Sequence, residues 1–155
     1  ASRVPFLNCQ GNAVASKLPV LSSKEHYLTR GFKRTLLEVE FERFNLFLMH
    51  LPLGHIARKS QLQEIAHICS DSKKPVVLAG DGNTYTGRKE IVPLMTKLGL
   101  KSVDMDFSPT YPSRSPVFFL DMVLCSSSIT VKNTFVPKVS FSDHLPVVCD
   151  LEMPE

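Results

Sequence analysis

The sequence has no long apolar run and no paired cysteines. No stretch approaches the roughly 20 consecutive apolar residues that a membrane-spanning helix needs. The amino terminus has neither the basic start nor the apolar run of a secretion signal. Cys9, Cys69, Cys125 and Cys149 form no Cys-x-x-Cys pair, which argues against a zinc site or a redox motif. We interpret them as buried free thiols, and the composition predicts a soluble, cytoplasmic protein.

The sequence also lacks a strong charge of either sign. The formal net charge is +3, which is compatible with a phosphate-bearing substrate but does not by itself indicate nucleic-acid binding. There is no internal repeat, low-complexity tract or linker, and 43% of the 155 residues are hydrophobic. Residues 1–155 are therefore predicted to form one globular domain with an apolar core.

Apolar patterning predicts a mixture of strands and helices. Strands are expected at residues 35–41, 44–51, 75–79, 117–124, 129–136 and 145–151, with the first two forming a hairpin. Helical spacing predicts helices at 57–70 and 89–98, the second ending at Gly99, while 80–87 and 108–116 are expected to be loops. Early alternation of strands and helices, followed by consecutive strands, favours a mixed sheet in a layered α/β or α+β domain.

Polar residues stand at or near the ends of these predicted strands: His50, Asp81, Asn83, Asp121, Asp143 and His144. Asp121 is the most unusual, because a carboxylate inside an apolar strand is costly unless it is paired. His144 is the natural partner, and we expect their side chains to approach within about 3.2 Å. Because loops at strand ends display reactive groups, we expect the whole set to converge on one concave site.

Each residue also has a plainer interpretation. Asp81 followed by Gly82 is a common turn dipeptide, and Asp143 could cap a turn before a strand. His50 could be a hydrogen-bonded histidine at a strand end. The basic residues Arg30, Lys33, Arg34, Arg58 and Lys59 are interpreted as solvated surface, although the first three could face an anionic ligand.

Five segments contain motifs in order along nearly the whole chain: GNAVAS at 11–16 with Pro19, HL at 50–51 with Arg58 and Gln61, VLAGDGN at 77–83, LDMVLCS at 120–126, and SDHLPV at 142–147. They resemble the motifs of the endonuclease/exonuclease/phosphatase family, and SDHLPV is the most specific. The resemblance implies a DNase I-like fold, a layered sandwich of two mixed β-sheets flanked by helices, in which 11–16 is a strand.

The resemblance implies catalytic roles for Asp81, Asn83, His144, Asp121 and His50, and metal ligation by Asp143 and Asp81. Asp81 would orient or deprotonate the attacking water, and Asn83 would donate a hydrogen bond to the phosphate oxygens. His144, oriented by Asp121, would stabilise developing charge or transfer a proton, and His50 would contact the phosphate. The expected cofactor is Mg²⁺, with Mn²⁺ as the alternative, because phosphoester hydrolysis needs a hard cation with oxygen ligands.

Three departures from the family pattern stand out. Gly82 replaces a bulky apolar residue, which is expected to remove packing beneath the loop, and Phe119 stands where many relatives have arginine. The sequence begins just before the GNA segment, so the family's amino-terminal part, with its principal metal-binding glutamate, is expected to be absent. We therefore expect this chain to bind Mg²⁺ poorly and to hydrolyse phosphoester substrates slowly or not at all.

The function implied is hydrolysis of a phosphodiester or phosphomonoester, with a nuclease among the possibilities. The expected partner is a phosphate-ester substrate, either nucleic acid or a phospholipid head group, and the oligomeric state is left open. Absence of tryptophan gives little support to a base-stacking platform. The alternative function is a non-catalytic phosphate-binding or scaffolding domain that lost the metal-binding glutamate.

Overall fold

A computed structural model describes residues 11–30, 34–139 and 141–154. Eight strands were found in them: β1 Ser22–Tyr27, β2 Thr35–Glu40, β3 Asn45–His50, β4 Val76–Asp81, β5 Leu100–Ser102, β6 Asp121–Ser126, β7 Thr130–Phe135 and β8 Val148–Glu152. The first six form one sheet in the order β1-β2-β3-β4-β6-β5, and β7 pairs with β8. Only β3 and β4 are parallel neighbours within the described part of the large sheet. The large sheet is therefore mixed, as predicted.

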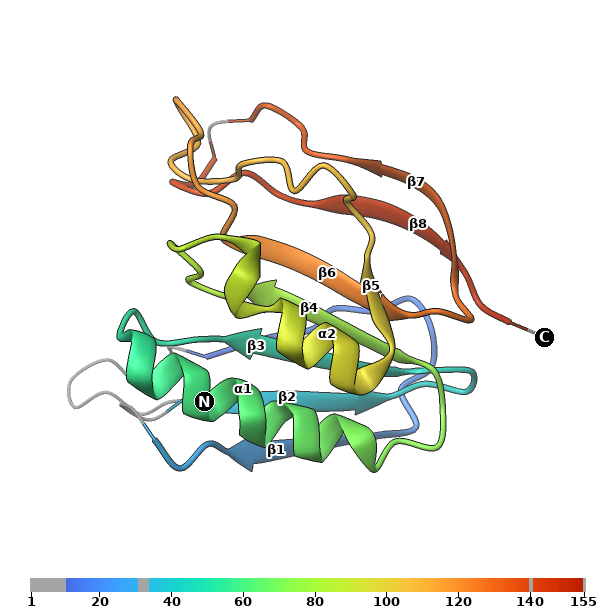
Figure 1. The fold of residues 1–155 in the computed structure, drawn as a ribbon. Helices are drawn as coiled ribbons and strands as arrows, with labels where there is room; N and C mark the ends of the chain where they lie inside the picture. Colours follow the sequence, from blue (N-terminus) through green and yellow to red (C-terminus); the bar gives the residue numbers. More distant parts are fainter. Residues whose placement is uncertain (1–10, 31–33, 140, 155) are drawn as a thin grey trace.

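Helices cover one face of the large sheet. The long helix α1, His55–Ser70, and the short helix α2, Val92–Leu98, lie side by side on that face, and the β7-β8 pair lies beyond β5 and β6 (Figure 1). A single 3₁₀ turn, η1 at Arg88–Glu90, precedes α2. Neither described α-helix is long and apolar enough to cross a membrane.

Two apolar clusters occupy the two faces of the large sheet. Alternate residues of β3, β4 and β6 pack toward the helices: Phe47, Met49, Val76, Leu78, Met122 and Leu124. The residues between them pack with side chains of β7 and β8: Leu46, Val77, Val123 and Cys125, against Val131, Cys149 and Leu151. This alternation is the period-2 pattern of a strand whose two faces are both covered. The molecule is a layered sandwich, as expected.

Most predicted elements are confirmed, including the β2-β3 hairpin and both helices. The first helix begins two residues earlier than expected, at His55. The second is divided, since 3₁₀ geometry at 88–90 gives way to an α-helix at Val92, with Pro93 in its first turn. The αL cap expected at Gly99 is present, with φ of 61°.

Other expectations about the strands were wrong. Residues 11–16 are not a strand, although the Asn12 amide donates to the carbonyls of Thr35 and Leu48 and so holds the segment against β2 and β3. Two strands were not predicted: β1, whose residues are polar and mostly exposed, and the three-residue β5. The β7-β8 pair is antiparallel and not mixed.

The cysteines among the described residues are free thiols. Cys69 and Cys125 are buried as predicted, while Cys149 is only partly buried. Burial raises the pKa of the Cys69 thiol to about 12, so that it stays protonated and unreactive near neutral pH. Cys9 lies outside the described residues.

Strand β4 continues further than predicted because of Gly80. The residue has a φ of +129°, and a Cβ atom there would lie 1.9 Å from the carbonyl oxygen of Met49 on β3. Only glycine permits this approach at such a φ. The strand therefore passes through Gly80 and ends at Asp81, instead of giving way to a loop at residue 80.

Substituting Gly80 with alanine should destabilise the fold by about 2 kcal/mol or more, because the residue combines a positive φ with a backbone clash. Gly99→Ala is the matched control, since Gly99 also has a positive φ but a Cβ there would meet nothing within 4 Å. That control should cost only about 1 kcal/mol. Urea denaturation would measure both values, and an equal loss would show that the contact with Met49 is unimportant.

Candidate functional site

Three of the predicted residues form one row across neighbouring strands. His50 pairs with Asp81 in the parallel β3-β4 register, and Asp81 pairs with Asp121 in the antiparallel β4-β6 register. Each occupies the face opposite the helices, as the alternation of its strand requires. His50 Nε2 lies 3.6 Å from Asp81 Oδ2. The row stands at the edge of the sheet where β3 and β4 end and β6 begins (Figure 1).

The loop after β4 is held by Asn83. Its backbone N–H donates to Asp81 Oδ1 at 2.8 Å, and its side-chain amide donates to Asp81 Oδ2 at 3.2 Å and to the Leu51 carbonyl at 2.8 Å. Asn83 has a φ of 48°, a left-handed conformation that asparagine tolerates well. The side chain is buried. Asn83 therefore fixes the Asp81 carboxylate and ties the two loops that follow β3 and β4.

The loss of packing expected at Gly82 was wrong. A Cβ atom at this position would lie 2.5 Å from the end of the Met122 side chain, which is itself buried. Met122 thus fills the space beneath the loop that a side chain at position 82 would otherwise take. The Gly82 N–H also donates to the Leu120 carbonyl at 2.8 Å. The loop carrying Asp81 and Asn83 is packed and hydrogen-bonded.

His144 reaches the row from the segment before β8. Its Nδ1 lies 2.7 Å from Asp121 Oδ2, which confirms the predicted pair. Asp121 does not, however, lie in the middle of a strand at 117–124 as expected, because it is the first residue of β6. Residues 117–120 form no strand, and their strand-like pairing is limited to an isolated β-bridge between Tyr111 and Phe118. The carboxylate is partly exposed at the sheet edge, with 23% of its side-chain surface accessible.

Residues of the 108–116 loop position His144, and they were not among the residues predicted for the site. The Thr110 carbonyl accepts from the Leu145 N–H at 2.8 Å, and the Thr110 hydroxyl accepts from the Asp121 N–H at 3.1 Å. Tyr111 packs its ring 4.8 Å from the imidazole, centre to centre. The signal available in the sequence was the pair Pro109 and Pro112, since prolines restrict the backbone of a loop; the structure shows that Thr110 between them is fully buried.

Asp143 lies beside the site, directly before His144 in the segment that precedes β8. Its backbone carbonyl accepts from Ser113 N–H at 2.7 Å. Its exposed carboxylate accepts a 3.2 Å hydrogen bond from the Ser142 hydroxyl. Its charge acts on both His144 and Tyr85. All six predicted residues therefore meet at one place; its concave shape stays a prediction.

Burial and neighbouring charges shift the pKa values of this cluster in different directions. Burial raises the pKa of Asp81 above its ordinary value, although the Asn83 N–H and His50 oppose the shift. Burial alone would lower the pKa of His144, but the hydrogen bond and charge of Asp121, with help from Asp81, raise it overall. Acidic and basic side chains whose pKa values are shifted by burial and by a neighbouring charge are common at functional sites.

His50 behaves differently from His144. Burial and the positive charge of Arg34 lower the pKa of His50, and the charge of Asp81 only partly offsets them. The lowered pKa therefore favours the neutral form of the His50 ring. The charge of Arg34 acts on His50, which agrees with the anion-facing interpretation of this arginine. Lys33 lies outside the described residues.

Arg58 was wrongly interpreted as solvated surface. It is only 2% exposed, and its guanidinium forms a two-pronged ion pair with Glu90 at 2.7 and 2.9 Å. It also donates to the carbonyls of Pro52 and Leu53 at 3.0 and 2.7 Å. Arg58 thereby links the loop after β3 to η1, the turn that follows the Asp81 loop. Gln61, the other residue of that motif, is also fully buried.

The donors of the site suit a hard cation only in part. Asp81 and Asp143 provide carboxylate oxygens, and Mg²⁺ is commonly held by one or two carboxylates together with water and substrate phosphate. No group of three or more His, Cys, Asp or Glu side chains placed to hold a metal occurs within residues 11–30, 34–139 and 141–154. By their chemistry the two carboxylates would need water and a substrate phosphate to complete a Mg²⁺ site, and Mg²⁺ binding stays a prediction.

Neither a protein-family model nor a curated protein matches the sequence. Solved structures do match. An endonuclease/exonuclease/phosphatase from Beutenbergia cavernae DSM 12333 has a TM-score of 0.75 and 20% identity, over 90% of this chain and 46% of its own. A mannosyl-6-phosphatase from Bacteroides thetaiotaomicron has a TM-score of 0.72 and 16% identity, over 87% and 67%.

A third match is D. rerio TDP2 complexed with single strand DNA product, with a TM-score of 0.69 and 18% identity over 86% of this chain and 68% of its own. The chain spans between 46% and 68% of the lengths of these three structures. Identities this low show the fold and not the activity. The chain has the DNase I-like fold of the endonuclease/exonuclease/phosphatase structures and corresponds to part of their domain.

Proposed function

We propose that this chain carries the catalytic residues of a Mg²⁺-dependent phosphoesterase that hydrolyses a phosphodiester or a phosphomonoester. The observation that carries the proposal is the row of His50, Asp81 and Asp121 with His144 hydrogen-bonded to its end at 2.7 Å. It brings a candidate base, Asp81, and a candidate acid, His144, together with the imidazole of His50 at one end of the sheet. Phosphoryl transfer needs such positioned groups more than it needs covalent chemistry by the protein.

His144 is proposed as the donor to the phosphate. A carboxylate can only accept, so Nδ1–H donates to Asp121 and Nε2 is left for the substrate. The raised pKa favours the protonated ring, whose Nε2–H can donate to a phosphoryl oxygen or to the leaving oxygen. Asp121 acts on the reaction through His144 and is a positioning residue.

Asp81 is proposed as the group that orients and deprotonates the attacking water. Its raised pKa makes the ionised carboxylate a stronger base than an ordinary aspartate. Asn83 holds this carboxylate through two hydrogen bonds. Its amide could reach a phosphate only by giving up a bond to Asp81 or Leu51, so positioning Asp81 is the role we favour over direct donation.

His50 and Arg34 are proposed to face the phosphate from the β2-β3 side. His50 in its neutral form, which the lowered pKa favours, can donate one hydrogen bond, and Arg34 supplies positive charge nearby. Asp143, with Asp81, would hold Mg²⁺, or Mn²⁺ in its place. A bound Mg²⁺ would polarise the phosphoryl group and neutralise developing negative charge.

The substrate is proposed to be a phosphate ester of nucleic acid or of a smaller molecule. Support comes from the likeness in fold to a mannosyl-6-phosphatase and to a protein complexed with a DNA product. The nucleic-acid and the phospholipid head-group alternatives differ outside the phosphate, so the proposed residues do not separate them.

The test of the function is hydrolysis of an aryl phosphodiester, an aryl phosphomonoester and plasmid DNA at matched Mg²⁺ concentrations. We expect slow, Mg²⁺-dependent turnover that His144→Ala abolishes and that His67→Ala, a change of an exposed histidine on the outer part of α1, leaves unchanged. Turnover that persists in His144→Ala would contradict the proposal. Saturable binding of a phosphate ester without any turnover would instead indicate a non-catalytic phosphate-binding domain.

Asp143→Asn should raise the Mg²⁺ concentration needed for half-maximal turnover by about tenfold or more, because one charged ligand is replaced by a neutral one. The fold should be unaffected, since the side chain is exposed. Asp150→Asn, an exposed aspartate on β8, is the control and should leave the Mg²⁺ dependence unchanged. Identical Mg²⁺ titrations for both variants would remove Asp143 from the metal site.

A further inference from the structure

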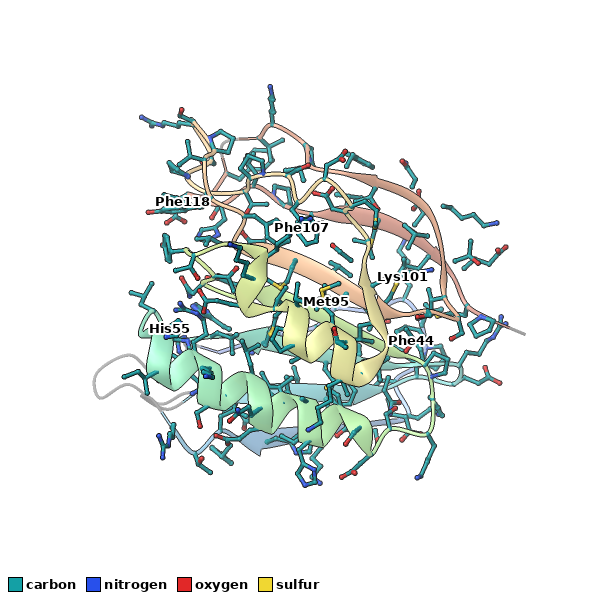
Figure 2. All side chains as sticks on the ribbon, in the orientation of Figure 1. Phe44, His55, Met95, Lys101, Phe107 and Phe118 are labelled. Carbon is teal, nitrogen blue, oxygen red and sulfur yellow. The ribbon has the colours of Figure 1, made fainter. Side chains whose placement is uncertain are left out.

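The two helices enclose a groove that the proposed chemistry does not use. It has a volume of about 710 Å³ and lies between α1 and the η1-α2 segment. Its floor is aliphatic, formed by Leu62, Ala66 and Leu94, which are themselves nearly covered. Its size is that of sites that bury a compact ligand or an anchoring side chain. Figure 2 shows His55, one lining residue, at the amino-terminal end of α1.

Three lysines line the groove: Lys59 from α1, Lys89 from η1 and Lys97 from α2. All three are exposed, and their aliphatic stems extend the apolar lining while their ammonium groups stay in water. The one carboxylate in the lining, Glu90, is already paired with Arg58 at 2.7 Å. Within the part of the chain that the structure describes, none of the three lysines forms an ion pair, so the groove combines an apolar floor with a rim of positive charge.

We propose that this groove is a docking site for an acidic amphipathic helix of a protein partner. An apolar face would fit the aliphatic floor, and glutamates or aspartates beside it would meet the lysine rim, which is the usual geometry of a helix lying in a groove. Charge complementarity selects the partner, because a basic or neutral helix would leave the lysines unpaired. The proposal is independent of the proposed phosphoesterase activity.

A helix suits the groove better than a nucleic acid or an anionic membrane. A phosphate backbone is recognised by open basic surfaces and would gain nothing from an aliphatic floor. A membrane needs apolar side chains that project outward, whereas Leu62 and Leu94 are 6% and 3% exposed and form the bottom of a depression. Side chains projecting from a helix can reach this floor.

The experiment titrates the chain into a fluorescein-labelled helical peptide with leucines at positions i, i+3, i+4 and i+7 and glutamates between them, and follows fluorescence anisotropy. Saturable binding is expected, with a Kd on the order of 100 μM or tighter. The triple variant Lys59→Glu/Lys89→Glu/Lys97→Glu should weaken it at least about tenfold. The matched control Lys24→Glu/Lys73→Glu/Lys138→Glu makes the same charge change at exposed lysines outside this groove and should bind normally.

Two further measurements distinguish binding in the groove from nonspecific attraction between opposite charges. A peptide with serines in place of the leucines should bind at least about tenfold more weakly, since it cannot use the aliphatic floor. Equal binding of the leucine and serine peptides, or equal weakening by the two triple variants, would overturn the proposal. So would absence of saturable binding, or tighter binding of an oligonucleotide or of phosphatidylserine vesicles that depends on the three groove lysines.

Discussion

Asp121→Asn is expected to lower kcat/KM by about 10²- to 10⁴-fold, because it removes the carboxylate that orients His144 and favours its protonated form. The direction of the pH effect follows from the same contact. Asp121 raises the pKa of His144, so its loss should lower that pKa. If the protonated ring is the active form, activity is lost as pH rises through the pKa, and this alkaline limb should move to lower pH.

Two measurements test this expectation. The pH profile of kcat/KM gives the alkaline limb, and NMR titration of the His144 ring protons gives its pKa without relying on turnover. Asp71→Asn, an exposed aspartate just after α1, is the matched control and should change neither quantity. A normal rate in Asp121→Asn, or an unchanged alkaline limb beside a lowered pKa, would show that the protonated ring is not the reacting form.

The row of functional residues could be predicted because strands alternate their side chains. His50 and Asp81 end their strands and Asp121 begins its strand, and neighbouring strands bring such residues together at one end of the sheet. The pairing of Asp121 with His144 also followed from the sequence. The extent of β4 did not, because Gly80 can either end a strand or permit a close approach, and only the position of Met49 decides.

Other features depend on contacts between distant parts of the chain. Met122 compensates for Gly82 from a different strand, and no local pattern indicates that packing. The polar strand β1 forms because it pairs with β2 along its whole length, a tertiary effect that outweighs its weak strand propensity. The Thr110 hydroxyl accepts a hydrogen bond from the Asp121 N–H, which is 11 residues away in the sequence. Sequence spacing alone does not reveal such bonds.

Among the residues whose surroundings were not predicted from the sequence, Arg58 has the largest expected effect on the free energy of unfolding. Arginine after a helix start is usually solvated, and the segment does not show that the guanidinium lies between two loops. Burial alone would raise the pKa of Glu90, but the hydrogen bond from Arg58 and that from Thr86 lower it overall. The pair therefore stays charged inside the structure. The Arg58–Glu90 pair connects the loop that follows His50 with η1, the turn that follows the Asp81 loop.

Arg58→Met should destabilise the chain by about 3–5 kcal/mol, because it leaves the buried Glu90 carboxylate without its partner. It also removes the donor to the Pro52 and Leu53 carbonyls. The double variant Arg58→Met/Glu90→Met removes both charges and should recover a large part of this loss, since apolar replacement of a buried ion pair is often nearly neutral. Urea denaturation with comparison of m-values measures both.

Lys59→Met is the matched control, since the neighbouring side chain on α1 is exposed and should change stability by no more than about 0.5 kcal/mol. The double variant keeps the fold but loses the polar link between the two loops. If that link positions the site, the double variant should show a lower kcat with normal stability. Equal stability of Arg58→Met and the unaltered chain would mean that Glu90 finds water or another donor, and that the ion pair contributes little.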